Sequence, residues 1–314
     1  MKGKTFLVFS ALLIFFVSGC VSSAENTNKD FINIPDIDSY DLILVGEDHT
    51  NSENVDVELR LIKHYYALGI RDFAFEAGYG DAMFFHHYIT TGDKECLEFI
   101  FKTNSDTAVS TNESLKFYRD LYKWNSRLKD KIRIHGFDVE HKPVMGVTAA
   151  WFFILKNYKQ YKDVPLTTSQ DRKKFIQDYQ RGVQPYSDLT TEDLKLLKRI
   201  MQCIEQAELV YYDSGFNDAI REQCMTENLL EITLNSKNKK TFAITGAWHA
   251  ALTGLVMGKP GMANALKSKI RVASLLLGPG DNPKLWPYNV LVNEEIKVTP
   301  YNSTYSGNWP FSTK

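Results

Sequence analysis

Short apolar runs alternate with long amphipathic stretches along this chain, and the alternation predicts its fold class. Five runs bounded by polar or glycine residues cover residues 41–46, 72–76, 132–138, 241–246 and 270–278. Runs that are continuously apolar are typical of strands buried on both faces of a sheet. With helical stretches between them, they predict an α/β fold with a mostly parallel central sheet and helices on both faces. A sixth run, residues 289–293, is expected at an edge.

The stretches between the runs have helical patterns. Thr50 followed by Glu53 is a capping-box pattern, and the helix that it starts is expected to end before Gly69. No strand pattern occurs at about 143–236, where we predict a helical insertion with amphipathic helices over 194–211 and 220–234. The insertion belongs to a single predicted domain of residues 39–314. Residues 299–314 are expected to be irregular.

The first 20 residues have the pattern of a lipoprotein signal peptide. Lys2 and Lys4 precede an apolar run from Phe6 to Val17 that is too short to cross a bilayer comfortably. Small residues then precede Cys20, an order that resembles the bacterial lipobox, in which cleavage leaves a lipid-carrying cysteine. Residues 1–19 are therefore the predicted signal peptide, and 20–38 the lipidated cysteine and linker. Ordinary signal cleavage and an uncleaved anchor remain alternatives.

The charge of the chain indicates which partners to expect, and its cysteine content indicates which disulfides to expect. The 314 residues hold 37 Lys and Arg against 38 Asp and Glu, and removing 1–19 leaves 295 residues with a formal charge of −3. Without a basic block, nucleic acid is an improbable partner. We expect a small-molecule substrate, an extracytoplasmic location and attachment to a bacterial membrane through lipid on Cys20. Cys96, Cys203 and Cys224 are expected to be small buried side chains, with a Cys203–Cys224 disulfide as the alternative.

Acidic and histidine residues follow four successive predicted strands. They are Glu47 and His49 after the first, Glu76 after the second, Asp138 after the third and His249 after the fourth. Because the carboxyl ends of parallel strands meet at one edge of a sheet, we expect these side chains to converge. A neutral histidine can take a proton from water while a carboxylate fixes its tautomer, so the set is suited to water activation. It is equally suited to binding Mn, Fe or Zn.

A predicted helix before the fourth strand carries polar residues on an apolar stripe. Arg221, Met225, Asn228 and Ile232 recur at helical spacing. One interpretation is that Arg221 reaches the strand-end edge and pairs with a carboxylate or an oxyanion. In the other, the core stripe runs through Ile220 and Cys224, and Arg221 lies at the surface. No GxSxG motif or phosphate-binding loop is present.

Several blocks together resemble the erythromycin esterase-like family. They are VGEDHTNSE, FEAGYGDAMFFHHYITTGD, FYRDLYKWN, IRIHGFDVE, IREQCMTEN and ITGAWHAAL, in the family's order over about residues 40–255. The resemblance implies hydrolysis of an ester or lactone by histidine-activated water, without an obligatory metal. It implies that His49 is the general base, that Glu47 and Glu76 orient it, and that Arg221 and His249 share its cleft. Asp138, Asn228 and Trp248 are expected to bind substrate.

The sequence departs from the esterase pattern at three positions. Its first motif, Glu-Asp-His, is one residue shorter than that of the esterases, and Gly246 stands where the late motif has its first histidine. The esterase pattern also has an arginine early in the first helix, whereas Arg60 here comes later. The short first motif is closer to the related ChaN-like proteins, which are haem-binding lipoproteins. That branch implies an alternative function in haem or ligand binding, with Tyr79, Tyr88, His86 and His87 as haem contacts. The Tiki/TraB branch implies a metal-dependent hydrolase or peptidase using His49, Glu76 and His249.

Overall fold

The computed structural model describes most of the region between residues 36 and 277. The described residues are 34, 36–47, 49, 54–107, 110–158, 189–211, 216–253, 255–256, 258–277, 288–292 and 296–297, with six more positions between 170 and 181. The predicted signal peptide, Cys20, Thr50, Glu53 and residues 299–314 lie outside them. Residues 36–314 cluster as one unit, and the fold below is that of this unit.

A seven-stranded sheet has the order β3-β2-β4-β1-β7-β8-β9. The first five strands in this order are mutually parallel, β8 is antiparallel to β7, and β9 is antiparallel to β8. The strands are β1 (Leu42–Glu47), β2 (Asp72–Phe75), β3 (Arg133–Gly136), β4 (Thr241–Gly246), β7 (Val272–Leu277), β8 (Tyr288–Val292) and β9 (Ile296–Lys297). A small hairpin, β5 (Leu255–Val256) and β6 (Lys259–Pro260), lies apart from the sheet.

The predicted α/β class with a mostly parallel sheet is confirmed, and one strand differs in position. The sixth apolar run forms β8, antiparallel to β7 as a neighbour of the parallel strands. It is not itself the edge, because the two-residue strand β9 pairs with its outer side. So short a strand has no periodicity that a sequence pattern could reveal.

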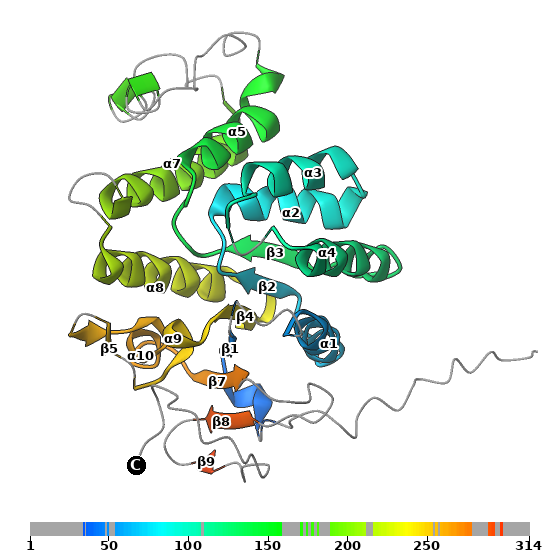
Figure 1. The fold of residues 1–314 in the computed structure, drawn as a ribbon, viewed down its shortest axis with the longest axis vertical. Coiled ribbons are helices and arrows are strands. Elements are labelled where there is room, and N and C mark those ends of the chain that lie inside the picture. Colours follow the sequence, from blue (N-terminus) through cyan, green and yellow to red (C-terminus); the bar gives the residue numbers. More distant parts are fainter. Residues whose placement is uncertain are drawn as a thin grey trace, which may run out of the picture. The chain divides into compact units, whose positions relative to one another are not determined.

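Nine described α-helices surround the sheet (Figure 1). They are α1 (Asn54–Ala67), α2 (Tyr79–Thr91), α3 (Lys94–Thr103), α4 (Asn112–Asn125), α5 (Pro143–Phe153), α7 (Thr191–Tyr211), α8 (Asp218–Asn235), α9 (Ala247–Ala250) and α10 (Met262–Leu266). The described residues between 143 and 236 form α5, a 3₁₀ turn, α7 and α8, without a strand. None of the described helices is long and apolar enough to span a bilayer.

Helices cover both faces of the sheet. On one face, Leu42, Leu44 and other strand residues pack against α8, α9 and α10 in a single apolar cluster. On the opposite face the ring of Phe242 lies 4.9 Å from that of Tyr65 in α1, between ring centroids. Burying each such large side chain contributes about 1.5–3 kcal/mol. This two-sided burial is why the strands have no polar alternation.

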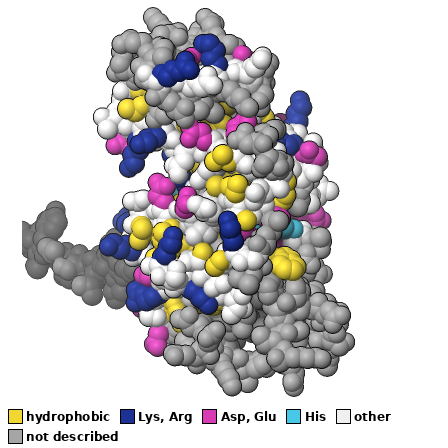
Figure 2. All heavy atoms as spheres, turned by 90° about the vertical axis from the view of Figure 1, so that its left-hand side faces the viewer, with side chains coloured by type: hydrophobic (Ala, Val, Ile, Leu, Met, Phe, Trp, Pro, Cys, Tyr) yellow, Lys and Arg dark blue, Asp and Glu magenta, His cyan; other side chains and the backbone are white. Residues whose placement is uncertain are grey.

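Two further observations concern the charged side chains on the surface and the state of the cysteines. The face in Figure 2 has basic and acidic side chains interspersed, with no large region of one sign. Cys96, Cys203 and Cys224 are all buried free thiols, as predicted, so the disulfide alternative is wrong.

A buried carboxylate fixes the start of β2 against its neighbour β3. Asp72 is 1% exposed, and it accepts hydrogen bonds from Arg133 Nε at 2.7 Å and from the Lys237 amide at 2.9 Å. His135 Nε2 lies 2.8 Å from the same carboxylate. Burial acts to raise the pKa of Asp72, but His135 and Arg133 lower it to about 2. Asp72 is therefore ionised in the folded protein, where it ties two strands together.

We expect Asp72→Asn to lower the free energy of unfolding by about 1–3 kcal/mol at pH 7, because charge-assisted hydrogen bonds are lost. In the wild type this contribution is present above the ordinary pKa of 3.8 and is lost as the pH falls through about 2. Urea denaturation at several pH values measures both effects. As a control, Asp130→Asn removes an exposed carboxylate paired with Arg71 and should change little. Equal losses in the two variants would contradict the role of Asp72.

Candidate active site

The parallel strands bring the residues that follow β1, β2, β3 and β4 to one edge of the sheet. In the strand register, Glu47 at the end of β1 lies opposite Gly246 at the end of β4. The chain after β2 stays beside β4, since the Glu76 amide donates to the Ile244 carbonyl at 3.1 Å. The chain after β3 stays beside the end of β2 in the same way. The structure thus brings together Glu47, His49, Glu76, Asp138 and His249, with Arg221 from α8.

Arg221 is at the centre of this cluster. Its Nη2 donates to Glu76 Oε1 at 2.7 Å and to Asp138 Oδ2 at 2.5 Å, while its Nε donates to Asp138 Oδ1 at 3.0 Å. The Arg221 side chain is only 12% exposed. The sequence allowed Arg221 either to reach the strand-end edge or to lie at the surface, and the structure agrees with the first interpretation. This one guanidinium connects the ends of β2 and β3 to α8.

The two carboxylates bound by Arg221 are both ionised. Burial acts to raise the pKa of Glu76, but His249, His49 and Arg221 together hold it well below its usual range. Asp138 is fully buried, and His141 and Arg221 likewise lower its pKa against the effect of burial. Glu76 also accepts hydrogen bonds from Thr245 Oγ1 at 2.7 Å and from the Gly246 amide at 2.6 Å. These carboxylates are fixed negative charges, poorly suited to accept a proton.

His49 is the most exposed histidine of the cluster, with 47% of its side chain accessible against 40% for His141 and 15% for His249. Its Nδ1 contacts Glu47 Oε1, and its Nε2 lies 3.7 Å from Glu76 Oε2. The hydrogen bonds from His49 to Glu47 and Glu76 raise its pKa to about 11. A Cβ atom on Gly246 would lie 3.0 Å from His49 Nε2, so a side chain at position 246 would require the ring to shift by a few tenths of an ångström.

His249 has a second carboxylate partner that the sequence interpretation missed. His249 lies in α9 directly after β4; its Nδ1 contacts Glu222 Oε1 and its Nε2 lies 3.4 Å from Glu76 Oε1. Burial acts to lower the pKa of His249, but Glu76 and Glu222 raise it overall. The second oxygen of Glu222 accepts the Met262 amide at 2.5 Å. The signal for Glu222 was present, since it begins a second buried stripe with Thr226, Leu229 and Thr233.

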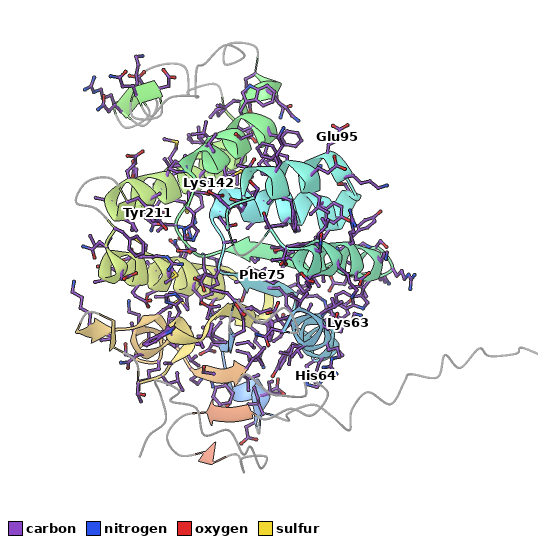
Figure 3. The ribbon with its side chains drawn as sticks, viewed as in Figure 1. Lys63, His64, Phe75, Glu95, Lys142 and Tyr211 are labelled. Atoms are coloured by element: carbon purple, nitrogen blue, oxygen red, sulfur yellow. The ribbon has the colours of Figure 1, made fainter. Side chains whose placement is uncertain are left out.

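A third histidine–carboxylate pair, also missed, lies beside Arg221. His141 Nε2 is 2.7 Å from Asp138 Oδ2, and its Nδ1 is 2.5 Å from the hydroxyl of Tyr211. Figure 3 labels Tyr211, at the C-terminal end of α7. His141 is three residues beyond Asp138 in the same loop, a spacing that is visible in the sequence. Its partner Tyr211 is 70 positions away and has no recognisable motif.

The residues expected to bind substrate have different environments. Asn228 is fully buried, and its amide donates to the Phe137 carbonyl at 3.0 Å and pairs with Gln206. Its geometry supports the chain after β3 and leaves no surface for a substrate. Asp138 is buried beneath Arg221. Trp248, next to His249, is 58% exposed and is the accessible member of the three.

Of the four residues named for the haem alternative, three line one hollow and the fourth does not. Tyr88 is buried against Tyr122 in α4. Tyr79, His86 and His87 line a hollow of about 420 Å³ beside β3, whose lining includes none of the His49 cluster. His86 Nδ1 accepts the Ile134 amide at 3.3 Å, which uses that nitrogen within the protein.

Comparisons with known proteins support the fold. No protein-family profile and no curated protein sequence matches the chain. Five solved chains match it by structure. One, a Bacillus cereus protein, has 18% identity and a TM-score of 0.52 over 76% of this chain and 65% of that one. This chain therefore matches less than two thirds of that protein's length.

A mutant of the erythromycin esterase EreC in its open conformation matches with 11% identity and a TM-score of 0.52, over 80% of this chain and 76% of that one. The haem-bound ChaN of Campylobacter jejuni has 15% identity over 80% of this chain and 86% of that one. Its TM-score of 0.31 carries no argument. At these identities the likeness concerns the fold alone: the chain has an α/β fold similar to that of erythromycin esterase.

We expect Arg221→Ala to lower the free energy of unfolding by about 3–5 kcal/mol, because the buried carboxylates of Glu76 and Asp138 lose their common cation. Urea denaturation at pH 7 measures this loss. Arg271→Ala is the matched control, since Arg271 is 63% exposed and paired with Asp41 at the start of β1. A loss no larger than that of the control would show that the cluster does not depend on Arg221.

Proposed function

We propose that this protein is a hydrolase that cleaves an ester or lactone with a water molecule activated by His49. The observation that carries the proposal is the position of His49, an accessible imidazole beside Glu47 and Glu76 at the rim of a buried charged cluster. Of the other two histidines, His249 is only 15% exposed, and both ring nitrogens of His141 are engaged, one by Asp138 and one by Tyr211. Histidine is the usual general base when water is the nucleophile.

Each side chain of the cluster has a role in this scheme. Glu47 accepts a hydrogen bond from the Nδ1–H group of His49 and so leaves Nε2 as the basic nitrogen. Nε2 takes a proton from water, and the water oxygen bonds to the carbonyl carbon of the substrate. The resulting oxyanion is stabilised by the positive charge of Arg221 and of protonated His249. The carbon–oxygen bond to the leaving alkoxide then breaks, and His49 returns the proton to that alkoxide.

The buried carboxylates support this chemistry indirectly. Glu76 and Asp138 hold Arg221 in place, and Glu222 holds His249. Groups fixed before the reaction need no reorganisation as charge develops, which is the main advantage of a preorganised site. Exposed Trp248 beside His249 offers an apolar surface for a substrate.

The location of the protein is part of the proposal. The lipobox-like sequence before Cys20 and the polar linker after it support attachment to a bacterial membrane on its extracytoplasmic side. A lipid-anchored hydrolase there would meet its substrate before that substrate enters the cell.

The decisive experiment compares His49→Ala with the wild type on a panel of aryl esters and macrocyclic lactones. We expect the variant to lose a factor of roughly 10²–10⁴ in kcat, the usual contribution of a general base. His64→Ala is the control, because His64, labelled in Figure 3, lies on α1 outside the cluster. A chelator should leave the wild-type activity intact. Full activity in His49→Ala would overturn the assignment of the base.

The pH dependence offers a second prediction. A base works only when deprotonated, and the pKa of His49 is raised to about 11, so the wild-type rate should keep rising well above the ordinary histidine pKa of 6.5. Glu47→Gln removes the largest cause of this shift, and its kcat/KM profile should start to rise at lower pH, with a smaller maximum. Asp56→Asn, an exposed change on α1, should leave the profile unmoved. A profile that is identical in Glu47→Gln and the wild type would contradict the Glu47–His49 pair.

A further inference from the structure

Three metal-ligating side chains converge at the turn between α2 and α3, far along the chain from the strand-end residues. His87 lies in the last turns of α2, Asp93 is the N-cap residue of α3, and Cys96 follows in its first turn. Gly92 joins the helices with a φ of +78°, a conformation that strongly favours glycine. This turn brings the three side chains together although none of them belongs to the His49 cluster.

Two of the three distances among these side chains match the ligand separations of a tetrahedral site. His87 Nε2 lies 3.4 Å from Asp93 Oδ2, and Cys96 Sγ lies 3.3 Å from the same oxygen. One ligand atom from each residue lies within 4.8 Å of the others. Zinc bonds of about 2.0–2.3 Å to nitrogen, oxygen and sulfur separate tetrahedral ligands by about 3.3–3.6 Å. A zinc ion therefore fits between these atoms with small side-chain adjustments.

We propose that His87, Asp93 and Cys96 bind a zinc ion, with water as the fourth ligand. An imidazole, a carboxylate and a thiol together select a borderline metal such as Zn²⁺ over Mg²⁺ or Ca²⁺, which prefer oxygen ligands. Coordination releases the thiol proton of Cys96, which otherwise donates to Asp93. Sulfur becomes a thiolate ligand and no redox change occurs.

The residues around the three side chains hold them in place and leave one side of the group open to solvent. Cys96 is 5% exposed, which keeps its sulfur fixed, whereas the side chains of His87 and Asp93 are 29% and 34% exposed. The His87 ring is held edge-on by Phe152 and Phe153. Asp93 Oδ1 accepts the Glu95 amide at 3.0 Å, which orients the carboxylate and leaves Oδ2 facing the other two ligands. An ion could thus enter from solvent and find the three ligand atoms already in place.

The experiment titrates the full chain, freed of metal by chelation, with Zn²⁺ and with Co²⁺. We expect about one Zn²⁺ to be retained after dialysis, and Co²⁺ to give the near-ultraviolet thiolate charge-transfer band together with strong visible bands of tetrahedral cobalt. Cys96→Ser should abolish the charge-transfer band. That band reports sulfur, so metal bound by histidines and carboxylates near His49 would not produce it.

Two further variants separate ligation from folding. Asp93→Asn keeps a good N-cap for α3 but removes the carboxylate, and it should weaken Zn²⁺ binding about tenfold or more. Glu95→Gln removes an exposed carboxylate of the same turn, labelled in Figure 3, and should bind like the wild type. The proposal fails if Co²⁺ gives no thiolate band, if the band survives in Cys96→Ser, or if Asp93→Asn binds as tightly as Glu95→Gln. Ester hydrolysis is not a readout here, so these outcomes are independent of the proposed activity.

Discussion

The pairing of Arg221 with Glu76 and Asp138 is the interaction on which the rest of the site depends. These carboxylates follow two different strands, and the arginine comes from a helix more than 80 positions later in the chain. Taking three charges out of water is costly unless each finds a partner, so the cluster forms only when the sheet and α8 are in place. The site is for this reason a product of the whole fold and not of any one segment.

The same interaction determines the behaviour of the histidines. Four carboxylates, those of Glu47, Glu76, Asp138 and Glu222, lie beside a single arginine and three histidines. With one permanent positive charge against four acidic groups, each imidazole gains by holding a proton. We assign His49 and His249 different roles because the side chain of the first is nearly half exposed while that of the second is only 15% exposed. Exposure, more than residue type, separates the proposed base from the proposed electrostatic support.

Much of this arrangement was predictable because it follows from periodicity. The strands are buried on both faces, which makes them continuous apolar runs, and parallel strands bring their carboxyl ends together whatever the connecting residues are. Glu222 begins a stripe at helical spacing and His141 follows Asp138 by three residues, but their partners His249 and Tyr211 lie 27 and 70 positions away, so no local pattern reveals what they bind. The short strand β9 and the His87–Asp93–Cys96 cluster were missed for a related reason. The first is too short for a period, and the second has no known spacing motif.

The glycine at position 246 links two positions that otherwise look independent. A side chain there would press on the His49 ring, while its backbone amide is already bonded to Glu76. A side chain at position 246 would therefore require the His49 ring to shift by a few tenths of an ångström. The positions of residues 49 and 246 are thus coupled, because the glycine leaves room for the imidazole to keep its contacts with Glu47 and Glu76. The smallest residue of the site in this way sets the position of its most exposed imidazole.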